Sequence, residues 1–123
     1  MFERYSMIIC SGLSARYLVN DQSVKPVRGH VIRMKAPWVK GFIRHVDNDD
    51  KGRSKHILVN QDTVVIGSLK QQDCTEPKPQ EGDKKWTMLE AKRFVPSLEY
   101  AEYVVQWVGF RPSRPTVRLE KEI

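Results

Sequence analysis

Arginines separated by prolines stand near the end of the chain, in the segment GFRPSRPTVRLEKE (residues 109–122). Pro112 and Pro115 fix φ and remove backbone donors, so the backbone around them cannot be helical. In a polyproline-like conformation of about three residues per turn, Arg111 and Arg114 would point the same way as a two-pronged anion receptor. Such rigid arginines could bind a planar carboxylate or phosphate through paired hydrogen bonds. The segment is either an anion site or a solvated basic strand end, and spacing alone does not separate the two.

Other site chemistries have weaker support. The three histidines, His30, His45 and His56, and the two cysteines show none of the spacings of metal ligands, so no metal site is predicted. Cys10 lies in CSG without a nucleophile-elbow motif, and we interpret it as a buried strand residue. Cys10 and Cys74 do not make a disulfide framework, so reduced thiols are expected. His56, at the start of an apolar strand, is typical of an edge residue.

Composition indicates one ordinary domain. The 123 residues are 40% hydrophobic and 29% charged, which is normal for a globular protein. The net charge of +6 permits a nucleic-acid or membrane-surface partner, but no run of five like charges supports nucleic-acid binding. No apolar stretch approaches 18 residues, and the first ten residues carry charges where a signal peptide would be apolar. We therefore expect a soluble, intracellular protein that binds neither nucleic acid nor membrane.

The positions of apolar residues predict the elements that would hold such a site. The pattern predicts α+β, with a mostly antiparallel sheet, in the order strand, helix, several strands, helix, strand. The predicted strands are 5–9, 30–38 (closed by Pro37), 56–60, 63–69 and 101–108, the middle two forming a hairpin. Helices are expected after the turn at Ser11 and Gly12 and from residue 84 to Pro96, the second with Trp86, Leu89 and Phe94 at helical spacing. Residues 45–55 and 70–83 are predicted to be polar, exposed loops.

Three blocks, CSGLSARYL, PVRGHVIRMKAPWVKGFI and VGFRPSRPTVRLEKE, resemble the FAD-dependent D-amino-acid oxidase family. Within it they look most like the members that act on acidic D-amino acids such as D-aspartate. The resemblance runs from about residue 5 to the end and matches only the middle portion of such an oxidase. It implies a partial flavin-binding segment at 1–28 (one strand and helix), a substrate domain at 29–110 with a twisted antiparallel sheet and two or three helices, and a substrate-clamp segment at 111–123.

The resemblance also implies roles for single residues. Arg111 matches the clamp on the α-carboxylate of a D-amino acid, while Arg44 and Lys70 match basic positions near a second carboxylate. His56 stands where the family has an active-site tyrosine. The turn of Cys10, Ser11 and Gly12 matches the family's C-T/S-G turn beside FAD, where small residues suit a short turn. No residue is assigned as catalytic, because the flavin carries the redox chemistry that yields a 2-oxo acid, ammonia and hydrogen peroxide.

The departures from the family are equally specific. The sequence has no G-x-G-x-x-G after an N-terminal strand and no glycine-rich segment near its end, so the main flavin-phosphate contacts are missing. The chain is therefore interpreted as a fragment or truncated form, and in isolation as inactive. The alternative is a flavin-free relative with at most a weak anion site. A peroxisomal or cytoplasmic location is expected, although KEI is not a peroxisomal tripeptide.

Overall fold

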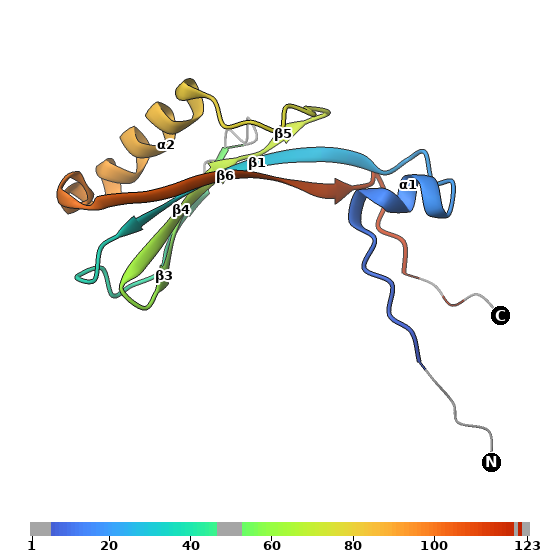
Figure 1. Cartoon of the computed structure of the whole chain (residues 1–123), viewed down its shortest axis with the longest axis horizontal. Coiled ribbons are helices and arrows are strands. Elements are labelled where there is room, and N and C mark those ends of the chain that lie inside the picture. Colours follow the sequence, from blue (N-terminus) through green and yellow to red (C-terminus); the bar gives the residue numbers. More distant parts are fainter. Residues whose placement is uncertain (1–5, 47–52, 120, 122–123) are drawn as a thin grey trace, which may run out of the picture.

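The structure, a computed structural model, describes residues 6–46, 53–119 and 121. Its six strands form one antiparallel sheet, with two α-helices and two short 3-10 helices (Figure 1). This confirms the predicted α+β class. In chain order the elements are η1 (Gly12–Ser14), α1 (Ala15–Leu18), β1 (Lys25–Lys35), β2 (Ile43–Val46), β3 (Arg53–Asn60), β4 (Thr63–Leu69), β5 (Gln71–Gln72), α2 (Glu81–Phe94), η2 (Pro96–Tyr100) and β6 (Glu102–Ser113).

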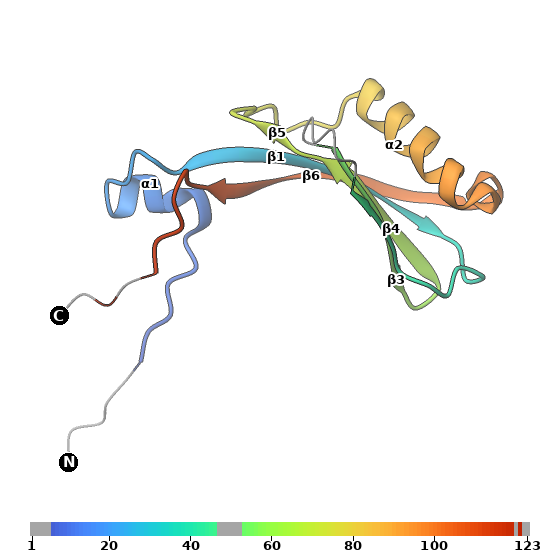
Figure 2. The same ribbon diagram turned by 180° about the vertical axis from the view of Figure 1, so that it is seen from behind.

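Strand β1 is the centre of the sheet. The strand order is β2-β3-β4-β1-β5, and β6 also pairs with β1 along its whole length, from Lys25↔Ser113 to Lys35↔Glu102. The β1 and β6 strands therefore form one long ribbon, from which β4, β3 and β2 extend at one end (Figures 1 and 2). The predicted hairpin is confirmed as β3 and β4, which pair from Ile57↔Ile66 to Asn60↔Thr63 around a two-residue turn.

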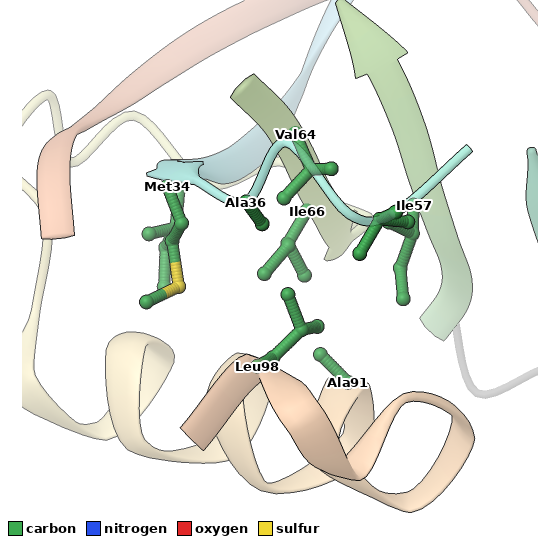
Figure 3. Close-up of a cluster of buried hydrophobic side chains, with 9 residues drawn as sticks. Met34, Ala36, Ile57, Val64, Ile66, Ala91 and Leu98 are labelled. Carbon is green, nitrogen blue, oxygen red and sulfur yellow. The ribbon is translucent and has the colours of Figure 1, made fainter. Parts of the chain in front are cut away.

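The hydrophobic core lies between the sheet and α2. Side chains from β1, β3 and β4 meet Ala91 of α2 and Leu98 of η2, and Leu98 is fully buried (Figure 3). Ile32 and Met34 point into this layer, whereas Arg33 and Lys35 lie on the other face, as the alternation in the sequence predicts. Burying this one face leaves the opposite face of the sheet without a covering helix among the described residues (Figure 1).

The second predicted helix is confirmed as α2, but the apolar residues that predicted it do not form its buried face. Leu89 is 60% exposed and Phe94 is also exposed, whereas the buried residues are Asp83, Thr87, Glu90 and Ala91. The physical reason is that two carboxylates on this face are paired with cations from the sheet. Asp83 pairs with Arg28 at 2.8 Å, and Glu90 pairs with Lys55 at 2.7 Å. These buried ion pairs, rather than apolar periodicity, orient the helix.

The segment from 70 to 83 is only partly the exposed loop that was predicted. Arg28, 1% exposed, donates from Nε to the Glu76 carbonyl (2.9 Å), from Nη2 to the Lys78 carbonyl (2.8 Å) and from Nη1 to Gln71 Oε1 (2.6 Å). These bonds hold the loop against β1, and β5 adds a short strand there. Helix α2 then begins at Glu81, where the side chains of Gln80 and Asp83 form a capping box.

The predicted strand at 5–9 is not observed in its described part. Residues 6–10 form no strand and are exposed, including Cys10, which was expected to be buried. A strand requires a neighbour for its backbone hydrogen bonds, and no described element pairs with this segment. The helix after the turn is confirmed as η1 and α1, at the end of the sheet where both terminal segments leave it (Figure 1).

The predicted loop at 45–55 is shorter than expected. Its ends belong to β2, which continues to Val46, and to β3, which begins at Arg53. Residues 47–52, the rest of that prediction, lie outside the described residues.

Candidate anion-binding site

The uncovered face of the sheet carries one row of residues from five strands. The register pairs Arg44 with His56, His56 with Gly67, Gly67 with Val31, and Val31 with Trp107. Paired residues in an antiparallel sheet point to the same face. Arg44, His56, Gly67, Val31 and Trp107 therefore form a continuous line across the sheet, which we call the central row.

Arg111 approaches this row from β6. It pairs with Val27, two strand positions beyond the pair formed by Gly29 and Gly109. Its guanidinium group lies over Gly29, because a Cβ atom placed on Gly29 would be only 2.9 Å from Arg111 Cζ. The absence of a side chain at Gly29 thus lets an exposed arginine lie across the sheet surface. Strand β6 runs through Pro112 to Ser113, which confirms that Arg111 is presented from extended backbone.

His56 lies on Gly67 in the same way. A Cβ atom on Gly67 would overlap Nε2 of His56 and would lie 3.0 Å from Cγ1 of Val31. Burial lowers the pKa of His56 below its ordinary value, and the positive charges of Arg111 and then Arg44 lower it further. The imidazole is therefore neutral at neutral pH and lies within the electrostatic reach of both arginines. The structure brings together three of the four predicted substrate-binding residues.

Lys70, the fourth of these residues, is placed differently. It is exposed, one residue beyond the end of β4, and none of the pairs between the described strands includes it. Its position beside the central row is therefore not supported by the sheet register.

Arg114 does not accompany Arg111. Its Nε donates to Ser23 Oγ at 3.0 Å and lies 3.1 Å from Asp21 Oδ2. Hydrogen bonds from Ser23 lower the pKa of Asp21, and Arg114 and Arg118 add to this effect. Arg111 and Arg114 do not form a two-pronged receptor, because Arg114 follows the last residue of β6 and its guanidinium group binds Ser23 and Asp21. Arg114 thus connects the end of β6 to the loop before β1 through a hydrogen bond and an ion pair.

The turn of Cys10, Ser11 and Gly12 reaches the same end of the sheet. Gly12 has a φ of +56°, and a Cβ atom there would meet nothing within 4 Å, so the glycine is required by backbone conformation rather than by space. Gly12 and Pro112, the residue after Arg111, line one open hollow of about 770 Å³. The turn and the arginine segment are therefore neighbours, although 99 positions separate Gly12 from Arg111.

The described residues contain no group of three or more histidines, cysteines or acidic residues that could hold a metal ion. Both cysteines are free, as expected. In the part of the chain that the structure describes, no helix is long and apolar enough to cross a membrane.

Sequence reasoning missed several residues of this face. Gly29 and Gly67 are essential to its shape, and Gly67 could have been found by aligning the predicted hairpin opposite His56. Trp107 is half-exposed at the end of the central row, with the Arg33 guanidinium 5.5 Å from its ring centroid. A tryptophan on a polar face carried no signal in the sequence, because the apolar run around it is typical of a buried strand.

The fold of this chain is similar to part of two larger proteins in solved structures. Glycine oxidase from Geobacillus kaustophilus matches with a TM-score of 0.74 and 24% identity, over 86% of this chain and 29% of that one. Iminodiacetate oxidase from Chelativorans sp. BNC1 matches with a TM-score of 0.69 and 19% identity, over 87% of this chain and 30% of that one. These likenesses establish the fold.

Curated relatives are more similar in sequence, although no family model matches. A D-amino acid oxidase of Dugesia ryukyuensis is 35% identical over 125 residues, covering 99% of this chain and 35% of that protein. The D-aspartate oxidase of Homo sapiens is 34% identical over 117 residues, covering 95% and 33%. The chain belongs to the D-amino-acid oxidase family, and it spans about a third of the length of these relatives.

Proposed function

We propose that this chain provides the substrate-binding sheet of an FAD-dependent oxidase that deaminates D-amino acids, with acidic ones such as D-aspartate preferred. The products would be a 2-oxo acid, ammonia and hydrogen peroxide. The observation that carries the proposal is the position of Arg111 over Gly29, on the open face that it shares with Arg44 and His56. In this proposal residues 1–28 belong to the flavin-binding part, residues 29–110 bind substrate, and residues 111–123 return toward the flavin.

The residues present fit one part of the flavin. The exposed turn of Cys10, Ser11 and Gly12 has open space above Gly12, so its backbone can approach a ligand closely. It shares a hollow with the residue that follows Arg111. When bound there, the flavin would accept a hydride from the substrate Cα. The phosphate groups would need contacts that this sequence lacks.

The substrate would be held by its carboxylates. The exposed guanidinium of Arg111 can form two parallel hydrogen bonds to the α-carboxylate, which fixes both the position and the plane of that group. Arg44 lies within electrostatic reach of the same histidine, so it can receive a second carboxylate across the row. Lys70 and His56 complete the proposed set, His56 as a hydrogen-bonding group. The acidic side chain of a substrate would pair with Arg44, whereas a neutral side chain would leave Arg44 unpaired. This difference supports the preference for acidic substrates.

Peroxide formation tests this function. With FAD supplied, the full-length protein to which this chain would belong should release hydrogen peroxide from D-aspartate faster than from D-alanine. Arg111→Leu should lower kcat/KM for D-aspartate by at least about a hundredfold, since a bidentate charged contact is lost. Arg93→Leu is the matched control, because Arg93 is exposed on α2, on the opposite side of the sheet. An Arg111→Leu variant within a few-fold of the unaltered protein would contradict the assignment.

A flavin-free relative with an anion site is the second candidate. It is favoured by His56, which stands at a position where the family has a tyrosine. The visible spectrum after incubation with FAD and removal of excess separates the two. A flavin band near one equivalent supports the oxidase. No flavin band, with D-malate still bound, supports the flavin-free anion site.

A further inference from the structure

His56 is surrounded by fixed positive charge on the open face. Arg44 on β2 is its direct partner in the register, and Arg111 from β6 lowers its pKa. Arg33 on β1 is the other charged residue on this face near the central row, lying over Trp107. The nearest acidic group that the structure pairs with β3 is Glu90, which binds Lys55 on the opposite face, under α2. The charged residues that the register and the lowered pKa of His56 place beside the imidazole are therefore cations.

A cluster of cations of this kind would be stabilised by a bound anion, which would reduce the repulsion between the positive charges. Burial disfavours a proton on His56 and the two arginines also repel it, so the imidazole is held neutral. A dicarboxylate bound to Arg111 and Arg44 would cancel this repulsion and bring negative charge toward the ring. No described helix covers this face of the sheet (Figure 2), so we expect a water molecule or hydronium ion to reach the half-buried ring.

We propose that His56 takes up one proton from solvent when a dicarboxylate binds between Arg44 and Arg111, and that the resulting imidazolium makes the site selective for dicarboxylates over monocarboxylates. This rests on the proposed function and deepens it, because it gives the substrate preference a third charged group. A monocarboxylate on Arg111 leaves Arg44 unpaired and still repelling the proton.

The consequence is a specific pH dependence. Between the pKa of free His56 and its higher pKa in the complex, binding consumes a proton, so dicarboxylate affinity falls as the pH rises, by up to about tenfold per pH unit. Above the pKa of the complex, affinity no longer depends on this group. Monocarboxylate affinity should change much less over the same range.

Isothermal titration calorimetry tests the proton uptake directly. D-Malate and D-lactate would be titrated into the purified protein at about pH 7 in buffers with different ionisation enthalpies. The slope of the binding enthalpy against the buffer enthalpy gives the number of protons taken up. We expect a clear fraction of a proton, up to about one, for D-malate, and close to none for D-lactate.

Two histidine variants test whether the proton that is taken up with D-malate binds to His56. His56→Gln keeps a hydrogen-bonding side chain but cannot titrate, so proton uptake with D-malate should vanish and the preference for D-malate over D-lactate should fall at least several-fold. His45→Gln is the matched control, because His45 is on the neighbouring strand with its ring 5.1 Å from Phe94, and it should behave like the unaltered protein.

The outcomes distinguish this inference from the proposed function. D-Malate binding that is lost in Arg111→Leu but shows no proton uptake in the unaltered protein overturns the role of His56 and leaves the anion site intact. Uptake that persists in His56→Gln also overturns it. If D-malate does not bind, or binds Arg111→Leu as tightly as the unaltered protein, both the anion site and the His56 proposal fail.

Discussion

Arg28 and Asp83 form a buried ion pair, with 2.8 Å between Nη2 and Oδ2. Arg28 belongs to the central strand β1, and Asp83 lies in the first turn of α2, so the pair joins the sheet to its only long described helix. The residue after Arg28 is Gly29, which points to the opposite face and lies under Arg111. The same stretch of β1 thus anchors the helix on one face and forms the floor of the candidate site on the other.

Replacing Arg28 should therefore unfold the protein more readily. Arg28→Met would leave Asp83 and two backbone carbonyls buried without their donor, and we expect a loss of about 3–5 kcal/mol in the free energy of unfolding. Urea denaturation followed by circular dichroism measures this loss. The control Arg93→Met removes the i,i+3 pair between an exposed arginine and Glu90, which keeps its partner Lys55, and should cost less than about 1 kcal/mol. Equal losses in the two variants would show that the Arg28 network contributes little.

The floor of the site can be tested with one methyl group. Gly29→Ala places a Cβ where the Arg111 guanidinium lies, so the arginine must move and D-malate affinity should fall by at least about tenfold. Gly109→Ala is the matched control, since Gly109 pairs directly with Gly29 but a Cβ there meets nothing within 4 Å. Calorimetric dissociation constants for the two variants should differ clearly. Similar constants would mean that the position of Arg111 over Gly29 is not needed for binding.

Local patterns in the sequence were sufficient for most of the sheet. The alternation of Ile32 and Met34 with Arg33 and Lys35 defined both faces of β1, and the short turn between β3 and β4 defined their pairing. The face of α2 could not be predicted in this way. Its buried positions include Asp83 and Glu90, whose partners Arg28 and Lys55 lie 55 and 35 residues earlier in the chain. Such long-range pairs have no local periodicity.

The candidate site shows the same division. The resemblance supplied Arg44, His56 and Arg111 as separate positions, but their gathering on one face follows from the register of five strands. The strand at 5–9 failed for a different reason. Its apolar residues do predict burial, but Ile8 and Ile9 have no neighbouring strand among the described elements and are exposed. The apolar composition of a segment indicates that it would be buried against a neighbouring element. It does not indicate whether this chain contains that element.

The ion pair between Lys55 and Glu90 predicts that the stability of the fold decreases at acidic pH. The hydrogen bond from Lys55 is the main cause that lowers the pKa of Glu90 below its ordinary value of 4.5. A lowered carboxylate pKa adds stability above 4.5, and this stability is lost as the pH falls through the folded-state pKa. Glu90→Gln should therefore lower the urea midpoint at about pH 7 and give a shallower decline below pH 4.5. If the urea midpoint of Glu90→Gln declined as steeply below pH 4.5 as that of the unaltered protein, Glu90 would not be the source of the acid sensitivity.

The histidine in the site has its own effect on stability, in a higher pH window. The pKa of His56 in the folded protein is below its ordinary value of 6.5, first because of burial and then because of Arg111 and Arg44. The unfolded chain therefore binds more protons, and stability falls as the pH drops from about 6.5 toward the folded-state pKa.

His56→Gln should reduce this slope of stability against pH, whereas Glu90→Gln should not, because Glu90 titrates below 4.5. Urea midpoints at several pH values between about 5 and 7 measure the slope. Saturating D-malate should also flatten the slope in the unaltered protein, since a bound anion offsets the part of the lowered pKa that Arg111 and Arg44 cause. A slope that is unchanged in His56→Gln would show that His56 is not the source of the slope.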